Sequence, residues 1–246
     1  MLVPILTYHR VADVPEGAAG WHLAVPPTAF AAQVAWLAGA GWQGFALRDL
    51  AAALLGHQRL PPRSVVFTFD GASRDVCSHA LGTLMERSFS GTVFAAPELV
   101  GGQGRAREPL ASWEGLRAAA AAGFEIGSQG ARHVSLAGRA PEDLAREIDG
   151  SHAAIAERLR IEPLTFAYPY GAFDARACEA VERAGYLAAV STERGVCHSR
   201  AMRFRLRRVP VSRSVTVARL ARRLTRLYDL EHRVKRFLRR RRERRR

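Results

Sequence analysis

Short apolar runs alternate along the first 200 residues with stretches in which apolar side chains recur every three to four positions. Residues 64–69 are apolar and rich in β-branched side chains, which is typical of a strand buried on both faces of a parallel sheet. In residues 27–40, Phe30, Val34 and Leu37 follow helical spacing. Alternation of this length predicts an α/β protein, either a barrel or a doubly wound sheet.

Apolar runs and helical spacing of apolar residues together divide the whole chain into predicted strands and helices. We expect strands at residues 3–8, 45–47, 64–69, 91–95, 124–127, 165–168 and 187–191. We expect helices at residues 27–40, 49–55, 76–86, 112–122, 141–159 and 174–184. No linker or internal repeat interrupts this series before residue 213, so residues 1–213 are predicted to form one domain and residues 214–246 a helical tail.

Composition excludes several classes of protein. With 48% apolar residues the chain is not disordered, and its three scattered cysteines form neither a disulfide framework nor a C-x-x-C zinc site. No run approaches 18 apolar residues, so we expect no transmembrane helix. The first residues lack a basic region before their apolar run and are interpreted as a strand rather than a signal peptide. These features predict a cytoplasmic protein with reduced thiols.

The net charge of +14 is concentrated in the tail. Residues 200–246 hold 20 Lys and Arg against three acidic residues, a charge of +17, whereas residues 1–199 sum to −3. The charge therefore does not indicate that the main domain binds nucleic acid. Apolar residues form a rough stripe in the tail, at Val217, Leu220, Leu224, Leu227, Val234, Phe237 and Leu238.

Three interpretations of residues 214–246 stay open. In the first, the stripe packs on the main domain and the run Arg239–Arg246 is solvated. In the second, the helix lies on an anionic membrane surface and the protein is peripheral to the bilayer. Nucleic-acid binding through phosphates is the least favoured of the three.

Four predicted strands end in polar side chains. His9, Asp70 and His133 follow three of them, and Tyr168 to Gly171 follow a fourth. In parallel α/β folds such ends meet at one edge, where functional groups gather. An Asp after an apolar strand serves as a general base or a metal ligand, but it equally caps the next helix, and a lone His is more often structural. The coincidence of the four ends favours a site.

These residues fall in segments that resemble the polysaccharide deacetylases (NodB-homology domain, carbohydrate esterase family 4). The resemblance covers about residues 3–213. Six collinear segments carry it: Ile5–Val11, Val65–Asp75, Gly91–Phe94, Glu125–His133, Phe166–Gly171 and Arg208–Val211. It implies an irregular (β/α) barrel of about seven strands and a hydrolase that removes N-acetyl groups from amino sugars, acting on carbon–nitrogen bonds other than peptide bonds.

The resemblance also implies roles for individual residues. Asp70 corresponds to the base that takes a proton from water, and His9 to the histidine that protonates the departing amine. The backbone N–H of Tyr170 corresponds to a donor to the oxyanion. Tyr168 and Pro169 correspond to substrate-binding positions.

The metal ligands of the family are not all present. The family holds a divalent metal such as zinc with Asp, His and His, and the matching positions here are Gly71, Gln129 and His133. One ligand of three does not hold a metal, so we expect no resident cofactor unless Asp70, Asp75, His79 or Glu125 substitutes. Two hypotheses follow: a hydrolase with a rearranged or absent metal, or a pseudoenzyme that binds an acetylated amino sugar or glycan.

Overall fold

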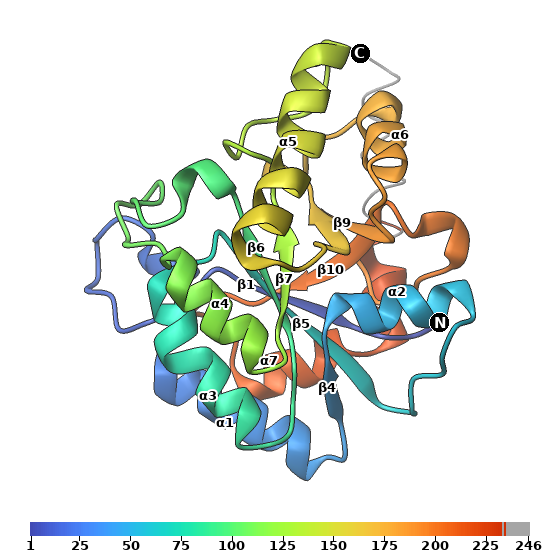
Figure 1. Cartoon of the computed structure of the whole chain (residues 1–246). Coiled ribbons are helices and arrows are strands. Elements are labelled where there is room, and N and C mark those ends of the chain that lie inside the picture. Colours follow the sequence, from blue (N-terminus) through green and yellow to red (C-terminus); the bar gives the residue numbers. More distant parts are fainter. Residues whose placement is uncertain (233, 235–246) are drawn as a thin grey trace, which may run out of the picture.

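The computed structural model describes residues 1–232 and 234, and parallel strands surrounded by helices make up its centre (Figure 1). The strands are β1 (Ile5–Tyr8), β2 (Arg10–Val11), β3 (Ala24–Val25), β4 (Gln43–Phe45), β5 (Ser64–Asp70), β6 (Thr92–Ala95), β7 (Glu125–Ser128), β8 (Thr165–Ala167), β9 (Ala188–Arg194) and β10 (Leu206–Pro210). The α-helices are α1 (Pro27–Gly39), α2 (Leu47–Leu55), α3 (Leu81–Met85), α4 (Trp113–Ala121), α5 (Pro141–Leu159), α6 (Ala175–Arg183) and α7 (Val217–Arg223).

Seven of the strands close into a ring. Their order is β1-β10-β9-β8-β7-β6-β5, all neighbours are parallel, and β5 pairs back onto β1 through the register Ile5–Val66 to Tyr8–Phe69. β4 is added beside the first half of β5, and β2 and β3 form a separate pair. This closed seven-stranded barrel confirms the fold that the sequence predicts.

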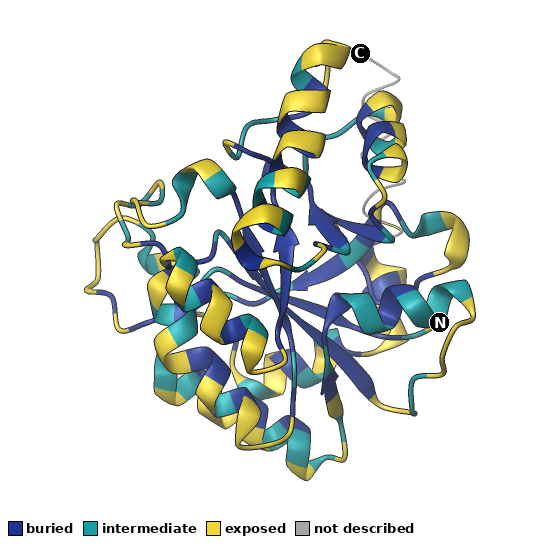
Figure 2. Ribbon diagram, viewed as in Figure 1, coloured by how far each residue is buried: buried dark blue, intermediate teal, exposed yellow. Residues whose placement is uncertain are grey.

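The barrel is buried and the helices cover it (Figure 2). β1 and β5 to β8 are buried along their whole length, which explains their continuous apolar sequences. The helices turn their apolar stripes inward and their polar faces to solvent. Parallel strands in a closed ring place all their carboxyl ends at one end of the barrel, and this end positions the site.

Some predicted boundaries differ from the structure for local reasons. The strand expected at residues 45–47 lies at Gln43–Phe45, because Ala46 is the N-cap of α2 and its N–H donates to the Asp49 carboxylate over 2.9 Å. The helix expected at 76–86 begins as a π-helical turn (Val76–Ala80) before α3. β9 extends to Arg194, three residues past the apolar run.

The first part of the C-terminal segment packs on the barrel. Leu220 and Leu224 are buried in the main core together with Tyr228, and Val217 is half-buried. Leu227 and Val234, from the same predicted stripe, are exposed. Phe237, Leu238 and the run Arg239–Arg246 lie outside the described residues. None of the described helices has the length and apolar character of a membrane span.

Candidate functional site

A cavity of about 300 Å³ opens at the carboxyl ends of the barrel strands. His9 follows β1, Asp70 ends β5, Gln129 and His133 follow β7, and Tyr170 follows β8, and all five line this cavity. The structure therefore brings together the polar strand ends that the sequence singles out. Most other lining side chains are apolar, among them Leu23, Leu99, Val100 and Leu110.

Asp70 is held at the cavity floor by Arg208 of β10. The guanidinium donates from its two terminal nitrogens to the two carboxylate oxygens, over 2.7 and 2.8 Å, and both residues are buried. Burial alone would raise the pKa of Asp70, but the charge and hydrogen bonds of Arg208 outweigh it and lower the pKa. Asp70 is thus a carboxylate at neutral pH, with a basicity reduced by its partner.

Sequence reasoning assigned no role to Arg208. A signal was nevertheless present, because Arg208 belongs to a strand whose apolar members Leu206 and Val209 are buried, and a buried guanidinium requires an acidic partner. Its Nε also donates to the carbonyl of Ser191 over 2.9 Å, and this bond helps to orient the guanidinium group toward Asp70.

Gly71 and Gln129 contact each other directly. The backbone N–H of Gly71 donates to Oε1 of Gln129 over 3.0 Å, and Gln129 is buried. Gly71 has a φ of +84°, and a Cβ at this position would meet no atom within 4 Å. The two residues at the expected ligand positions are thus joined by a hydrogen bond, and the amide oxygen of Gln129 is already engaged.

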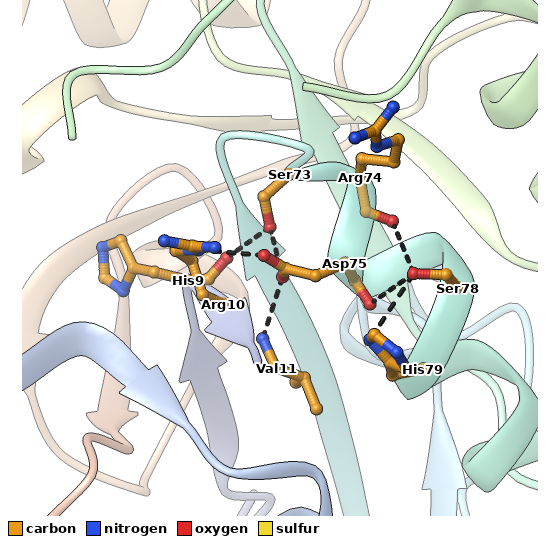
Figure 3. A network of polar contacts seen from close by, with 8 residues as sticks. All are labelled: His9, Arg10, Val11, Ser73, Arg74, Asp75, Ser78 and His79. Carbon is orange, nitrogen blue, oxygen red and sulfur yellow. Dashed lines mark hydrogen bonds and ion pairs between the residues drawn. The ribbon is translucent and has the colours of Figure 1, made fainter. Parts of the chain in front are cut away.

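Of the four substitute ligands, Asp70 shares the cavity with His133 but is paired with Arg208, and the other three are engaged or located elsewhere. Asp75 is engaged at β2, where it accepts from Arg10 Nε over 2.9 Å and from Val11 N over 3.0 Å, and it also accepts from Ser73 (Figure 3). His79 is exposed on the π-helical turn beyond it.

Glu125, the remaining candidate, is buried at the start of β7. It accepts hydrogen bonds from Thr92, Thr165 and the backbone N–H of Arg48, and burial raises its pKa. Within residues 1–232 and 234, no three His, Cys, Asp or Glu side chains lie close enough to hold a metal ion. The residues present therefore do not fit the metal centre that the family implies.

Two neutral imidazoles face the same cavity. Burial lowers the pKa of both His9 and His133, although the Asp70 charge acts in the opposite direction. The hydroxyl of Tyr170 donates to the backbone carbonyl of His133 over 3.0 Å, and it lies 3.1 Å from Nδ1 of the same residue. With the hydroxyl proton directed to that carbonyl, Nδ1 donates to the Tyr170 oxygen, and Nε2 of His133 is left as a hydrogen-bond acceptor.

The Tyr170 side chain forms part of the cavity rim. It is 47% exposed, its ring lies edge-on to His133 at 4.8 Å between centroids, and the guanidinium of Arg105 lies 4.9 Å from its centroid. Tyr170 and His133 both adopt left-handed backbone conformations, with φ of 59° and 56°. Such conformations cost about 1–3 kcal/mol in non-glycine residues and are concentrated at functional sites.

Tyr168 and Pro169 have mainly structural surroundings. The hydroxyl of Tyr168 donates to the carbonyl of Phe204 over 2.9 Å and its ring stacks on Phe173, so only part of the ring reaches the cavity. Pro169 is buried, near Gly130, outside the cavity lining. The three cysteines are free and half-buried, away from the cavity lining.

Sequence reasoning missed one wall of the cavity. Residues 99–111 form it and contribute Arg105, Ala106 and Glu108. The segment is tied to the chain after β5, because Ala111 N donates to Ala72 O over 2.9 Å and Leu110 forms a bridge with Ser73. This segment is rich in glycine and shows neither helical nor strand periodicity, so the sequence does not predict that it lines a cavity.

Known proteins resemble this chain over most of its length. The sequence profile of the polysaccharide deacetylase family matches residues 57–189. The Bacillus subtilis (strain 168) protein named "Putative polysaccharide deacetylase YxkH" is 26% identical over 210 residues, which cover 85% of this chain and 71% of that protein.

Solved structures agree on the fold. The Streptococcus pyogenes deacetylase PplD in complex with acetate superimposes with a TM-score of 0.81 and 21% identity, covering 91% of this chain and 98% of that one. IcaB from Ammonifex degensii gives a TM-score of 0.78 with 22% identity, covering 90% and 96% of the two chains. With the profile match across more than half of the sequence, the chain is a member of the polysaccharide deacetylase family.

Proposed function

We propose that this protein binds N-acetylated amino sugars of a glycan in the cavity at the carboxyl end of the barrel. The family as a whole acts on acetylated glycans, and the cavity volume is at the lower end of the range for small-molecule sites, about 300–1,000 Å³. Its apolar side chains suit an acetyl methyl group and the faces of a sugar ring. The neutral imidazoles of His9 and His133 can form hydrogen bonds with the amide and hydroxyl groups of such a sugar.

We further propose that the binding does not use the family's metal centre. The observation that carries this proposal is the hydrogen bond between Gly71 N and Gln129 Oε1. It engages the one weak donor atom that Gln129 offers, and Gly71 offers no side chain. His133 alone provides an imidazole, and a zinc-type site needs at least three protein ligands. The protein is therefore expected to be a glycan-binding pseudoenzyme.

The experiment compares acetylated and deacetylated ligands. A chitin tetrasaccharide and its fully deacetylated counterpart are titrated into the full-length protein, with chemical shifts of the protein amides as readout. We expect saturable binding of the acetylated form and at least tenfold weaker binding of the deacetylated form. Equal affinity for the two, or no binding of either, would overturn the proposal.

A second candidate function is hydrolysis without the family's metal. The observation that favours it is the common cavity of His9, Asp70 and His133, which matches a base with two proton-transfer groups. The bidentate contact of Arg208 acts against it, because it lowers the basicity of Asp70. Release of acetate from the same tetrasaccharide in the presence of a chelator, abolished by Asp70→Asn, would establish this activity in place of the pseudoenzyme.

A further inference from the structure

The end of the described chain is a helix with two apolar faces. Residues 226–232 and 234 are helical and follow α7. One face continues the contact of α7 with the barrel, because Leu224 and Tyr228 are buried in the main core. The other face points to solvent and consists of Leu227, Leu230 and Val234, which we call the outer face.

The outer face concentrates the exposed apolar surface of the molecule. Its members are 74%, 56% and 51% exposed, and they are three of the six large apolar residues that are exposed in the described chain. Their spacing of three and four positions places them side by side on one surface of the helix. Exposed apolar side chains scattered singly are ordinary, whereas a row of this kind marks an interaction surface.

The helix cannot turn this row inward, because its opposite face is fixed. Asp229 is buried, and its Oδ1 accepts from Val196 N over 3.2 Å and lies 3.7 Å from Arg207 Nη1. His232 is buried on the same side. A rotation that covered Leu227 and Leu230 would expose the Asp229 contacts and remove Tyr228 from the core.

The charges near the outer face are mainly positive. Arg222 and Arg226 are exposed just before it, and Glu231 is the acidic residue on its own helix that is exposed. Residues 233–246 of the sequence contain ten Lys and Arg against Glu243, a charge of +9. An apolar row flanked by many cations is the pattern of a helix that lies in the headgroup region of an anionic bilayer.

We propose that the outer face binds the surface of a membrane that contains anionic lipids, and that the net positive charge of the C-terminal sequence adds to the attraction. A second copy of this chain is a poor occupant, because it would bring two strongly basic segments together. Nucleic acid would use the arginines but not the three apolar side chains. The bilayer is the partner that uses both features, and this proposal is independent of what the cavity binds.

The test measures sedimentation of the full-length protein with vesicles. With vesicles of 30% phosphatidylglycerol in phosphatidylcholine we expect most of the protein in the pellet, and with pure phosphatidylcholine at least tenfold weaker partitioning. Replacing both Leu227 and Leu230 by serine should weaken partitioning at least fivefold, without a change in melting temperature. Met85→Ser is the matched control, because Met85 is 52% exposed at the end of α3, and it should have no effect.

Three results would overturn the proposal. The first is a Leu227→Ser/Leu230→Ser variant that sediments like the unchanged protein, which would reduce the effect to adsorption of the arginines. The second is absence of binding to the anionic vesicles, with or without tight binding of duplex DNA or RNA. The third is a dimer in light scattering that the double variant converts to a monomer, which would assign the outer face to a second copy.

Discussion

The amide oxygen of Gln129 accepts a hydrogen bond from the backbone N–H of Gly71 over 3.0 Å. The resemblance of the sequence segments to the family implies that these two positions correspond to a carboxylate and an imidazole that hold a metal. In this protein a hydrogen bond joins the two residues instead. The contact closes the cavity floor with neutral groups, next to a carboxylate that is already neutralised by Arg208.

Restoring the two ligands should restore metal binding. The double variant Gly71→Asp/Gln129→His provides a carboxylate and an imidazole beside His133, so we expect it to bind about one zinc ion per chain in equilibrium dialysis. Neither single variant should do so, because two ligands seldom suffice. The position of Gly71 has space for a side chain, but its φ of +84° adds strain of about 1–2 kcal/mol. A folded double variant that stays free of metal would contradict the inferred geometry.

The pair of Asp70 and Arg208 should be a strong determinant of stability. Arg208→Met leaves a buried carboxylate without its partner, and we expect the free energy of unfolding to fall by about 3–5 kcal/mol in urea denaturation. Asp70→Leu added to Arg208→Met should recover part of this loss, because neither charge is then unpaired.

The control for the buried pair is a pair on the surface. Arg146→Met removes an exposed contact with Asp143, and we expect a change of about 1 kcal/mol or less. Equal effects of Arg208→Met and Arg146→Met would show that the buried pair does not have the assigned role.

Stability should decrease in mild acid through His198. Burial, with the charge of the amino terminus, lowers the pKa of His198 to about 4. The unfolded chain binds a proton near pH 6.5 and the folded chain does not, so stability is lost as the pH falls from 6.5 to 4 and no further below that. The expected loss is about 3 kcal/mol.

Comparison with a variant isolates this contribution. His198→Asn should flatten the pH dependence between pH 6.5 and 4, measured by urea denaturation at a series of pH values. His9 and His133 also have lowered pKa values and act in the same direction, so a smaller slope should remain. An unchanged slope in His198→Asn would contradict the prediction.

The Tyr170 hydroxyl should fix the tautomer of His133. In the unchanged protein we expect nitrogen-15 shifts of the ring to show a protonated Nδ1 and an unprotonated Nε2. Tyr170→Phe removes the acceptor and should populate the other tautomer, with about tenfold weaker binding of the acetylated tetrasaccharide. Tyr186→Phe, at a buried hydroxyl outside the cavity lining, serves as control and should leave both unchanged.

Local patterns in the sequence predicted most of the barrel. The bounds of α5 were predicted without error, because Pro141 at the first turn and a long amphipathic stripe mark them. β5 was predicted to within one residue from its unbroken apolar run. The two-residue strands β2 and β3 were missed, since so short a segment has no period to detect.

The site was predictable only where a strand end carried the signal. His9 and Asp70 were recognised because each directly follows an apolar run, and His133 because it lies just beyond the strand predicted at residues 124–127. Arg208 lies 138 positions from Asp70, and only closure of the barrel through β1 brings their strands near each other. The cavity wall around Arg105 depends on the hydrogen bond between Ala111 and Ala72, which no local sequence pattern predicts. Tertiary contacts of this kind are not encoded in periodicity.

The most direct test of the account is ligand binding with every divalent metal removed. The full-length protein is titrated calorimetrically with the acetylated chitin tetrasaccharide, first in a chelator and then with added zinc. We expect the same affinity in both conditions, because Gly71, Gln129 and His133 do not form a metal site. Binding that is lost in the chelator and returns with one equivalent of zinc would contradict it.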